Sequence, residues 1–286
     1  MKMRAFTACF LVAVTSAAIA QEAHKTNQPP KILVMSREFV KPGRTGTMHE
    51  KTEAAFIQAF ASQNWPTHYL AVDSLSGKPR SLFFTGYDSF DAWEKDALAV
   101  QKNAALNTAL QRAGLTDADL LADMDGATFM LREDLSLRPG ADLPHMRYFE
   151  ITRFQVRPGH DKDFERLAKM AMVAWDKTPD VQWATYEIAY GAADGTFAIF
   201  TPRKSGAELD HAFAEGKDFE TAMGEENMKQ FRELWASTVE SSESNLFAFN
   251  PRMSYMGEEF TKADPDFWGV KALAMHAKKK GEEAKK

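Results

Sequence analysis

Cysteine is almost absent from this chain of 286 residues. The single cysteine is Cys9, in an apolar stretch near the start, and no lipobox-like Leu-x-x precedes it. One cysteine cannot form a disulfide within the chain, and it cannot supply the ligands of cysteine-bound zinc or of an iron–sulfur cluster. An ordinary hydrophobic core must therefore hold the fold together, and a chain of this length can build one.

An excess of positive charge is also missing. Lys and Arg number 35 against 40 Asp and Glu, so the formal net charge is -5. Nucleic-acid binding needs a broad basic surface. The one lysine-rich stretch, residues 276–286, also carries Glu282 and Glu283. We interpret this stretch as a solvated end of the chain and predict no nucleic-acid partner.

Long apolar runs are confined to the N-terminus. In "MKMRAFTACFLVAVTSAAIA", Lys2 and Arg4 precede an apolar run, and Ala18 and Ala20 form a small-residue cleavage motif. These parts predict a signal peptide over residues 1–20, cleaved near Ala20. We therefore expect a periplasmic or secreted protein. We expect no integral membrane segment, because no later run approaches the ~20 apolar residues of a spanning helix.

Several catalytic motifs are absent. The sequence has no Gly-x-Ser-x-Gly elbow, no phosphate-binding Gly-rich loop and no Gly-x-Gly-x-x-Gly fingerprint. The sequence therefore gives no motif evidence that the protein is a hydrolase, a kinase or a dinucleotide oxidoreductase. No two histidines are spaced His-x-x-x-His, and we predict no metal site and no cofactor. Haem binding stays open as an alternative, because one axial histidine can hold haem.

An internal repeat is the main positive feature. The phrases "VMSREFVKPGRTGTM" and "EITRFQVRPGHDKDF" each combine a strand pattern, a Pro-Gly corner and a helix start. The offset that aligns Arg37 with Arg153 also aligns Phe84 with Phe200, within "FFTGYDS" and "IFTPRKS". Matches that persist over such a distance indicate a duplication of domain-sized units.

The two copies predict the same series of elements. In order these are a strand (32–40; 148–156), a helix, a hairpin (67–87; 181–201), a second helical region (88–114; 207–240) and a last strand near the matching phrases "FMLREDLSL" and "FAFNPRMSY". This β-α-β-β-α-β order is typical of a ferredoxin-like unit. Such a unit leaves one sheet face uncovered, and two of these faces stacked together close a barrel.

We therefore predict an α+β fold in which two tandem ferredoxin-like units form an intramolecular α/β barrel. The expected division is a signal peptide (1–20), a disordered start (21–31), a first unit (32–137), a linker (138–147), a second unit (148–257), and a C-terminal arm and charged tail (258–286). Phe267 and Trp268 of that last segment could pack as a short arm, and most of the segment is expected to be peripheral.

Two phrases resemble a known superfamily. "YFEITRFQVRPGHDKDFERL" resembles the first strand, corner and helix of NIPSNAP-like and antibiotic-biosynthesis-monooxygenase-like domains, and "FFTGYDSFDAWEKD" resembles their third strand and second helix. Both families belong to the dimeric α/β-barrel superfamily. The resemblance implies a barrel that binds a small molecule, with cofactor-free monooxygenase chemistry in which the substrate itself reduces oxygen. The residue pattern of the haem-degrading branch is not met, since Ser36 and Thr152 stand where that branch has Asn.

Candidate site residues come first from the opening strand of each copy. Ser36 and Glu38 share one strand face opposite Arg37, and Glu150 and Thr152 share one face opposite Arg153. A polar pair that faces the barrel interior could orient a ligand, and a buried carboxylate with a raised pKa could act as a general base. Alternatively, Glu38 and Glu150 pair with the arginines or with nearby lysines.

The complete set of candidates includes His68 and Tyr87 as further catalytic groups. Trp183 and Tyr186 are candidate ligand-binding residues together with Ser36, Arg37, Thr152 and Arg153. We expect at most one of Trp183 and Tyr186 to face a given pocket, because they lie on opposite faces of one predicted strand. Aromatic residues at such spacing are also typical of a core.

The resulting hypothesis is an exported protein that binds a small aromatic or apolar molecule and performs monooxygenase-like chemistry if it is an enzyme. A non-catalytic stress protein, carrier or partner-binding scaffold is the alternative from another class, and haem binding is a second alternative. Homo-oligomerisation stays open, because an intramolecular barrel still leaves surfaces that can assemble.

Overall fold

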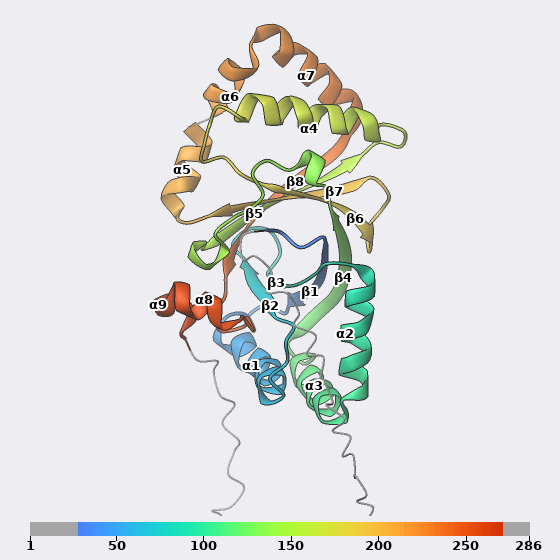
Figure 1. Ribbon diagram of the computed structural model, residues 1–286, viewed down its shortest axis with the longest axis vertical. Helices are drawn as coiled ribbons and strands as arrows, with labels where there is room; N and C mark the ends of the chain where they lie inside the picture. Colours follow the sequence, from blue (N-terminus) through green and yellow to red (C-terminus); the bar gives the residue numbers. More distant parts are fainter. Residues whose placement is uncertain (1–27, 215, 271–286) are drawn as a thin grey trace, which may run out of the picture.

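Eight strands form one closed antiparallel barrel in the computed structural model, which describes residues 28–214 and 216–270 (Figure 1). The strand order around the barrel is β1-β3-β2-β8-β5-β7-β6-β4. The α+β class and the closed barrel are confirmed. The predicted signal peptide, residues 21–27 and the lysine-rich end lie outside the described residues and stay predictions.

The elements of the chain follow a similar order in its two halves. The first half comprises β1 Ile32–Val40, α1 Thr47–Ser62, β2 Tyr69–Ser74, β3 Arg80–Tyr87, α2 Phe90–Lys102, α3 Ala104–Asp117 and β4 Leu121–Leu131. The second comprises β5 Tyr148–Val156, α4 Asp161–Trp175, β6 Ala184–Tyr190, β7 Thr196–Arg203, α5 Gly206–Ala214, α6 Gly216–Met223, α7 Glu225–Thr238 and β8 Val239–Phe249. Short helices η1 Glu133–Leu135, η2 Leu143–His145, α8 Glu258–Ala263 and α9 Pro265–Trp268 complete the described chain.

The opening strands β1 and β5 have the predicted boundaries. Each ends at its Pro-Gly corner, where Gly43 has φ 77° and Gly159 has φ 83°. Glycine adopts this left-handed conformation without the steric cost that a Cβ atom brings. The same Pro-Gly turn therefore ends the opening strand in both halves.

The helical regions are more broken than predicted. Asn103 ends α2 and also begins α3, where its side chain accepts a hydrogen bond from the backbone N–H of Leu106. In the second half, Gly224 has φ 75° and separates α6 from α7 within one predicted helical region. Apolar spacing does not show such breaks, because the capping residue decides them locally.

The last strands begin earlier than the matching phrases indicated. β4 starts at Leu121, and residues 122–126 are all exposed. A strand segment exposed on both faces carries no alternation of apolar and polar residues. The phrase that resembles its counterpart in the second half therefore covers only the end of β4 and the turn after it.

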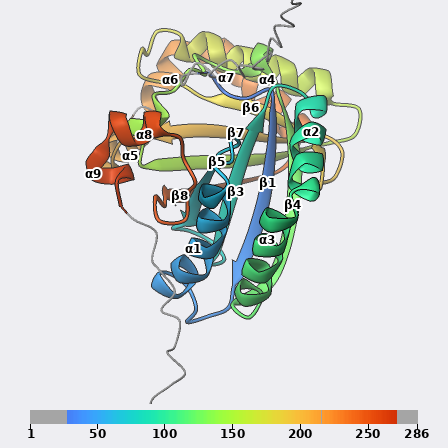
Figure 2. The same ribbon diagram turned by 60° about the horizontal axis from the view of Figure 1, so that its bottom comes forward.

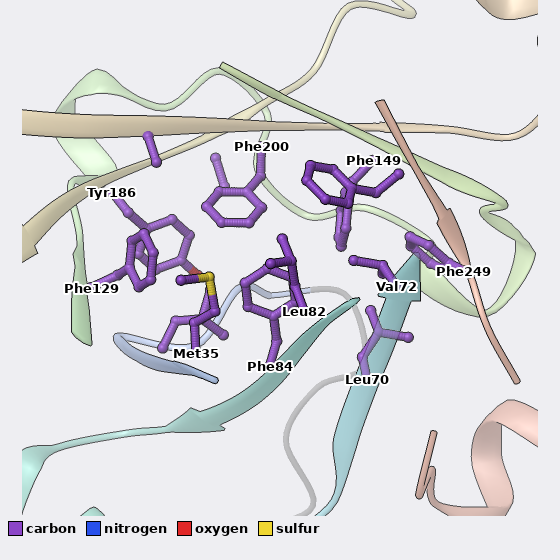
Figure 3. Packing of buried hydrophobic residues seen from close by; sticks show 14 of the residues in the cluster. Met35, Leu70, Val72, Leu82, Phe84, Phe129, Phe149, Tyr186, Phe200 and Phe249 are labelled. Atoms are coloured by element: carbon purple, nitrogen blue, oxygen red, sulfur yellow. The ribbon is translucent and has the colours of Figure 1, made fainter. Parts of the chain in front are cut away.

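Two seams close the barrel between the halves. β2 pairs with β8 through Val72 and Phe249, and β4 pairs with β6 through Phe129 and Ile188. The interior is filled mainly by large apolar side chains that point toward one another from all sides (Figure 3). The barrel interior thus holds the larger of the two buried apolar clusters.

Helices cover the outside of the barrel in two groups. α1, α2 and α3 lie along the first-half strands, and α4, α6 and α7 lie over the second-half strands (Figures 1 and 2). Under the second group, Phe154, Phe164, Leu167 and Phe197 form an apolar layer between sheet and helices. No described helix is long and apolar enough to cross a membrane.

The segment after β8 contributes to the core through Phe260 and Trp268, with Phe267 packed against them. Trp268 is 6% exposed, and its indole N–H donates a 2.7 Å hydrogen bond to the carbonyl of Pro144. Arg147 forms an ion pair with Asp264. The sequence showed the apolar residues of this arm but not their partners, which lie in the linker between the halves.

Candidate functional site

Strand alternation decides which predicted residues face the barrel interior. On β1, Leu33 and Met35 belong to the interior core and Arg37 lines an interior cavity. On β5, Phe149 and Arg153 face inward in the same way. The polar pairs Ser36 with Glu38 and Glu150 with Thr152 therefore lie on the outer faces, so neither pair lines the barrel interior.

One end of the barrel holds an apolar cavity of about 240 Å³, here called the aromatic cavity. Its wall comes from six strands and is formed chiefly by Leu33, Leu70, Phe84, Phe149, Trp183, Ala184, Tyr186 and Phe200. Concave, mostly apolar cavities with few polar groups are the usual sites for small molecules.

Segments outside the strands complete the aromatic cavity. Residues 28–30, Pro139, Ala141, Leu143 and Phe260 of α8 also line it. The hydroxyl of Tyr186 donates a 3.0 Å hydrogen bond to the carbonyl of Pro30. Residues 28–30 were expected to belong to a disordered start, but in the structure they form part of this wall.

His68 is the histidine of the aromatic cavity. Its ring stacks on Tyr255 with centroids 4.9 Å apart. Burial lowers the pKa of His68, and the charge of Glu259 on α8 opposes that shift. The imidazole is therefore neutral at neutral pH, which is the form that accepts a proton.

Another cavity, of about 490 Å³, lies farther along the barrel and is here called the arginine cavity. It is lined by Arg37 of β1, Arg80 of β3 and Arg153 of β5, together with Lys78 and Glu243. Positive charge therefore predominates at this end, which suits an anionic group. Phe84 and Phe200 line both cavities, their rings 5.4 Å apart, and stand between them (Figure 3).

Two of these arginines form ion pairs with acidic residues. Arg37 forms a bidentate pair with Asp125, with N–O distances of 2.8 and 2.5 Å. Arg153 lies 3.7 Å from Glu243. The arginines thus pair with acidic residues other than Glu38 and Glu150, which the sequence had offered as partners.

Haem does not fit either cavity. The aromatic cavity offers His68, but its charged lining residue is Glu259, which would repel the haem propionates. The arginine cavity offers cationic side chains for propionates, but no histidine lines it. Haem in the aromatic cavity would need His68 as its axial ligand beside the Glu259 carboxylate, and haem in the arginine cavity would have no lining histidine as its ligand. We therefore derive no reaction step through haem.

The remaining predicted site residues lie elsewhere. The Tyr87 hydroxyl donates a 2.9 Å hydrogen bond to Asp96, and burial together with the Asp96 charge raises the pKa of Tyr87. Glu150 pairs with Arg203 at 3.1 Å, and Thr152 hydrogen-bonds Ser244 at 2.8 Å. Their side chains are thus engaged with neighbours outside the two cavities.

Trp183 and Tyr186 both line the aromatic cavity, although at most one of them was expected in a single pocket. The physical reason is that Trp183 precedes β6, which begins at Ala184, so strand alternation does not govern it. Its indole N–H donates a 3.0 Å hydrogen bond to the carbonyl of Leu135. This bond fixes the ring at the cavity wall.

A buried polar group outside the barrel interior contains Glu38. We define the acid cluster as Glu38 of β1, His49 and Glu53 of α1, and Asp117 of α3, all of them buried. His49 Nε2 lies 3.0 Å from Glu38, 3.9 Å from Glu53 and 3.6 Å from Asp117. The cluster therefore joins one strand and two helices behind the barrel wall.

Protonation in the acid cluster follows from burial and crowding. Burial raises the pKa of Glu53 well above its usual range, and the charges of Glu38, Asp117 and Asp73 add to this. Burial also raises the pKa of Glu38, although its hydrogen bond to His49 opposes the shift. Without a further positive charge, the cluster must hold protons on its carboxyl groups.

Comparison with known proteins finds similarity among solved structures. No protein-family model matches the chain, and no curated protein matches it. Among solved structures, 49 chains match. One, described provisionally as a monooxygenase from Fusobacterium nucleatum, is 12% identical over 76% of this chain and 91% of its own, with a TM-score of 0.49.

Two more of these structures have similarly low sequence identity and TM-scores. An anthrone oxidase-like protein is 12% identical over 77% of this chain and 91% of its own, with a TM-score of 0.49. A mutant chlorite dismutase from Candidatus Nitrospira defluvii is 7% identical over 84% of this chain and 99% of its own, with a TM-score of 0.44. This chain is thus similar to monooxygenase-like and chlorite dismutase-like barrels, at likenesses that carry no argument about its chemistry.

Proposed function

We propose that this protein binds a small apolar or aromatic molecule in the aromatic cavity. The observation that carries the proposal is a partly open cavity of about 240 Å³ walled largely by aromatic rings at one end of a closed barrel. Transfer of an apolar molecule from water to such a wall is favourable by roughly 25 cal/mol for each Å² of apolar surface removed from water. Binding therefore needs no charged anchor.

The wall indicates the class of ligand. The ring of Phe200 meets those of Phe84 and Phe149 at 80° and 84°, so ring edges and faces alternate around the cavity. An aromatic ligand can make further edge-to-face contacts with such rings. Glu259 is the charged residue of the lining, and its carboxylate disfavours an anion. We infer a flat, uncharged ligand.

A larger side chain in the aromatic cavity should weaken ligand binding. Ala184 lines this cavity and Ala198 lines the arginine cavity, so Ala184→Leu and Ala198→Leu are a matched pair. We expect Ala184→Leu to weaken binding of the neutral fluorophore 1-aminoanthracene at least tenfold, because the added atoms occupy the ligand's volume. A fluorescence titration measures the dissociation constant. Equal affinity in wild type and Ala184→Leu, with loss only in Ala198→Leu, would place the ligand in the other cavity.

We further propose that the protein converts the bound ligand by monooxygenase-like chemistry. Of the predicted catalytic residues, His68 is the one that lines the aromatic cavity, and it is positioned to take a proton from an activated CH₂ group of the ligand. The resulting carbanion reduces O₂, so that R₂CH₂ + O₂ gives R₂C=O + H₂O. Carbon loses four electrons, one oxygen atom enters the product and the other becomes water. Oxygen uptake with anthrone, whose CH₂ is acidic, tests this step, and its absence would favour a non-catalytic carrier.

The lowered pKa of His68 predicts a defined pH effect on stability. A histidine with a folded-state pKa below its unfolded value of about 6.5 stabilises the fold fully above that value, and this contribution is lost as pH falls toward the folded pKa. His68→Gln should therefore reduce the loss of unfolding free energy between about pH 7 and pH 5. Urea denaturation measures it, with the exposed His211→Gln as the control. Parallel curves for wild type and His68→Gln would show that His68 is not the group involved.

We further propose that the protein is exported and that its halves descend from one duplicated ferredoxin-like unit, related to the NIPSNAP-like and antibiotic-biosynthesis-monooxygenase-like domains. The signal-like start supports export, and the shared register of β1 with β3 and of β5 with β7 supports the duplication. Self-association also stays a prediction, which light scattering would test.

Export predicts a shortened chain. Protein isolated from its own source should begin at Gln21, because the small-residue motif ends at Ala20. Intact mass spectrometry measures this end directly. A mass that retains Met1 or the apolar run in the mature protein would contradict cleavage, whereas the ligand-binding proposal would be unaffected.

A further inference from the structure

The acid cluster has the composition and size of a metal-binding site. One imidazole nitrogen and three carboxylate oxygens, from Glu38, His49, Glu53 and Asp117, all lie within 4.8 Å of one another. Four ligand atoms held at about 2.0–2.2 Å from one metal in a tetrahedral site are roughly 3.3–3.6 Å apart, so a small contraction of the cluster would bring these atoms onto one ion. The four residues come from one strand and two helices, so the fold itself brings them together.

An unpartnered oxygen points into the cluster. Glu53 is 3% exposed, and its Oε1 has no hydrogen-bond partner. This same oxygen lies 3.9 Å from His49 Nε2. A buried carboxylate oxygen without a partner carries a large desolvation cost. A bound cation would satisfy it, and the cluster offers it no hydrogen-bond donor.

The surrounding hydrogen bonds already orient His49 for ligation. Its Nδ1 lies 3.3 Å from the hydroxyl of Ser81, which donates to Asp73 at 2.5 Å, and Asn250 donates to the other Asp73 oxygen at 2.7 Å. With Ser81 donating onward, His49 Nδ1–H is the donor to Ser81. When a metal ion displaces the proton that Nε2 shares with Glu38, the bond from Nδ1 to Ser81 keeps Nε2 oriented toward the carboxylates, which is the role of outer-shell partners of metal-bound histidines.

The second half of the chain shows that packing alone does not require these groups. The register that places Glu38 opposite Ser81 on β1 and β3 places Phe154 opposite Phe197 on β5 and β7. Those phenylalanines pack between sheet and helices without buried charge. Buried ionisable groups are commonly less stabilising than apolar residues of similar volume. The polar filling of the first half therefore points to a function.

We propose that Glu38, His49, Glu53 and Asp117 bind one divalent first-row metal ion of the Zn²⁺, Mn²⁺ or Fe²⁺ class. One nitrogen and three oxygen ligands suit these ions better than soft thiolate-preferring ones. The ion neutralises two of the three carboxylate charges. Because four protein ligands fill a closed, buried site, the ion stabilises the packing of α1 and α3 on β1 and takes no part in turnover.

Metal binding is tested on the full chain, stripped with chelator and then titrated with Zn²⁺ or Mn²⁺. We expect one ion per chain by native mass spectrometry and a higher Tm in its presence. Glu53→Gln should weaken binding at least tenfold and abolish the Tm shift. Glu150→Gln, which removes a half-exposed carboxylate of the second half, should keep both. A bare mass for wild type, or equal metal response in wild type and Glu53→Gln, would overturn the proposal.

A measurement on the unmodified protein keeps the test decisive if a variant fails to fold. Co²⁺ added to the stripped wild-type chain should produce visible absorption bands typical of a four-coordinate nitrogen and oxygen site, and added Zn²⁺ should remove them by competition. A spectrum identical to Co²⁺ in buffer would contradict the site.

Discussion

Phe200→Ala is expected to destabilise the protein by about 3–5 kcal/mol. Phe200 is 6% exposed, and its ring contacts those of Phe84, Phe129, Phe149 and Tyr186. Removing it leaves a hole at the centre of the barrel that rigid strands cannot close. Because Phe200 lines both cavities, the substitution also joins them and should admit longer ligands than wild type does.

Denaturant unfolding measures the change in free energy, with Phe90→Ala as the control. Phe90 is 36% exposed on α2, so its removal should cost much less. A loss at Phe200 no greater than that at Phe90 would contradict a packed barrel centre. Unchanged ligand length selectivity in Phe200→Ala would contradict its position between the two cavities.

His49→Ala is expected to cost about 3–5 kcal/mol, even after metal has been removed by chelation. The carboxyl groups of Glu38 and Asp117 lie 3.0 and 3.6 Å from the imidazole and raise the pKa of His49, so the substitution removes the group that balances their charge. Glu53→Gln should instead be neutral or stabilising in the chelated protein, because it replaces a buried acid that already holds a proton. The two unfolding free energies are measured in one buffer with chelator.

The contrast between these variants separates two accounts of the acid cluster. If His49→Ala cost less than about 1 kcal/mol, the imidazole would not be balancing buried carboxylates. If Glu53→Gln were as damaging as His49→Ala in chelated protein, Glu53 would be ionised there. Either result would change the charge assigned to the cluster.

The barrel was predictable from sequence because its signals are local and repeated. The Pro-Gly corners after Val40 and Val156 set the strand ends, and the constant offset between the copies showed that the pattern was duplicated. Which face of each strand is inward was harder to predict. Strand alternation groups Glu38 with Ser36, but the side on which that group lies depends on the sheets that close the barrel.

The acid cluster shows what sequence could not supply. The His49-x-x-x-Glu53 spacing on α1 was present and would have paired these two residues. Glu38 precedes the corner before that helix, and Asp117 lies at the end of α3, so only the packed fold brings them within reach. The prediction of no metal site depended on the spacing of histidines. It did not consider carboxylates that come from separate helices and strands.

The aromatic cavity depends equally on contacts over long sequence distances. Trp183 and Tyr186 were identified as candidates, but Phe260 of the arm and the residues near Pro30 were assigned to peripheral or disordered segments. These segments carry few periodic signals of their own. They become ordered because the open barrel end offers apolar surface on which they pack.

The most direct test of ligand binding is native mass spectrometry of protein purified gently from its own source, compared with Ala184→Leu and Ala198→Leu prepared in the same way. The account predicts a small-molecule adduct on wild type and on Ala198→Leu, and a bare mass for Ala184→Leu. A bare mass for all three proteins, with no uptake of 1-aminoanthracene by the wild type, would contradict the claim that the aromatic cavity is a binding site.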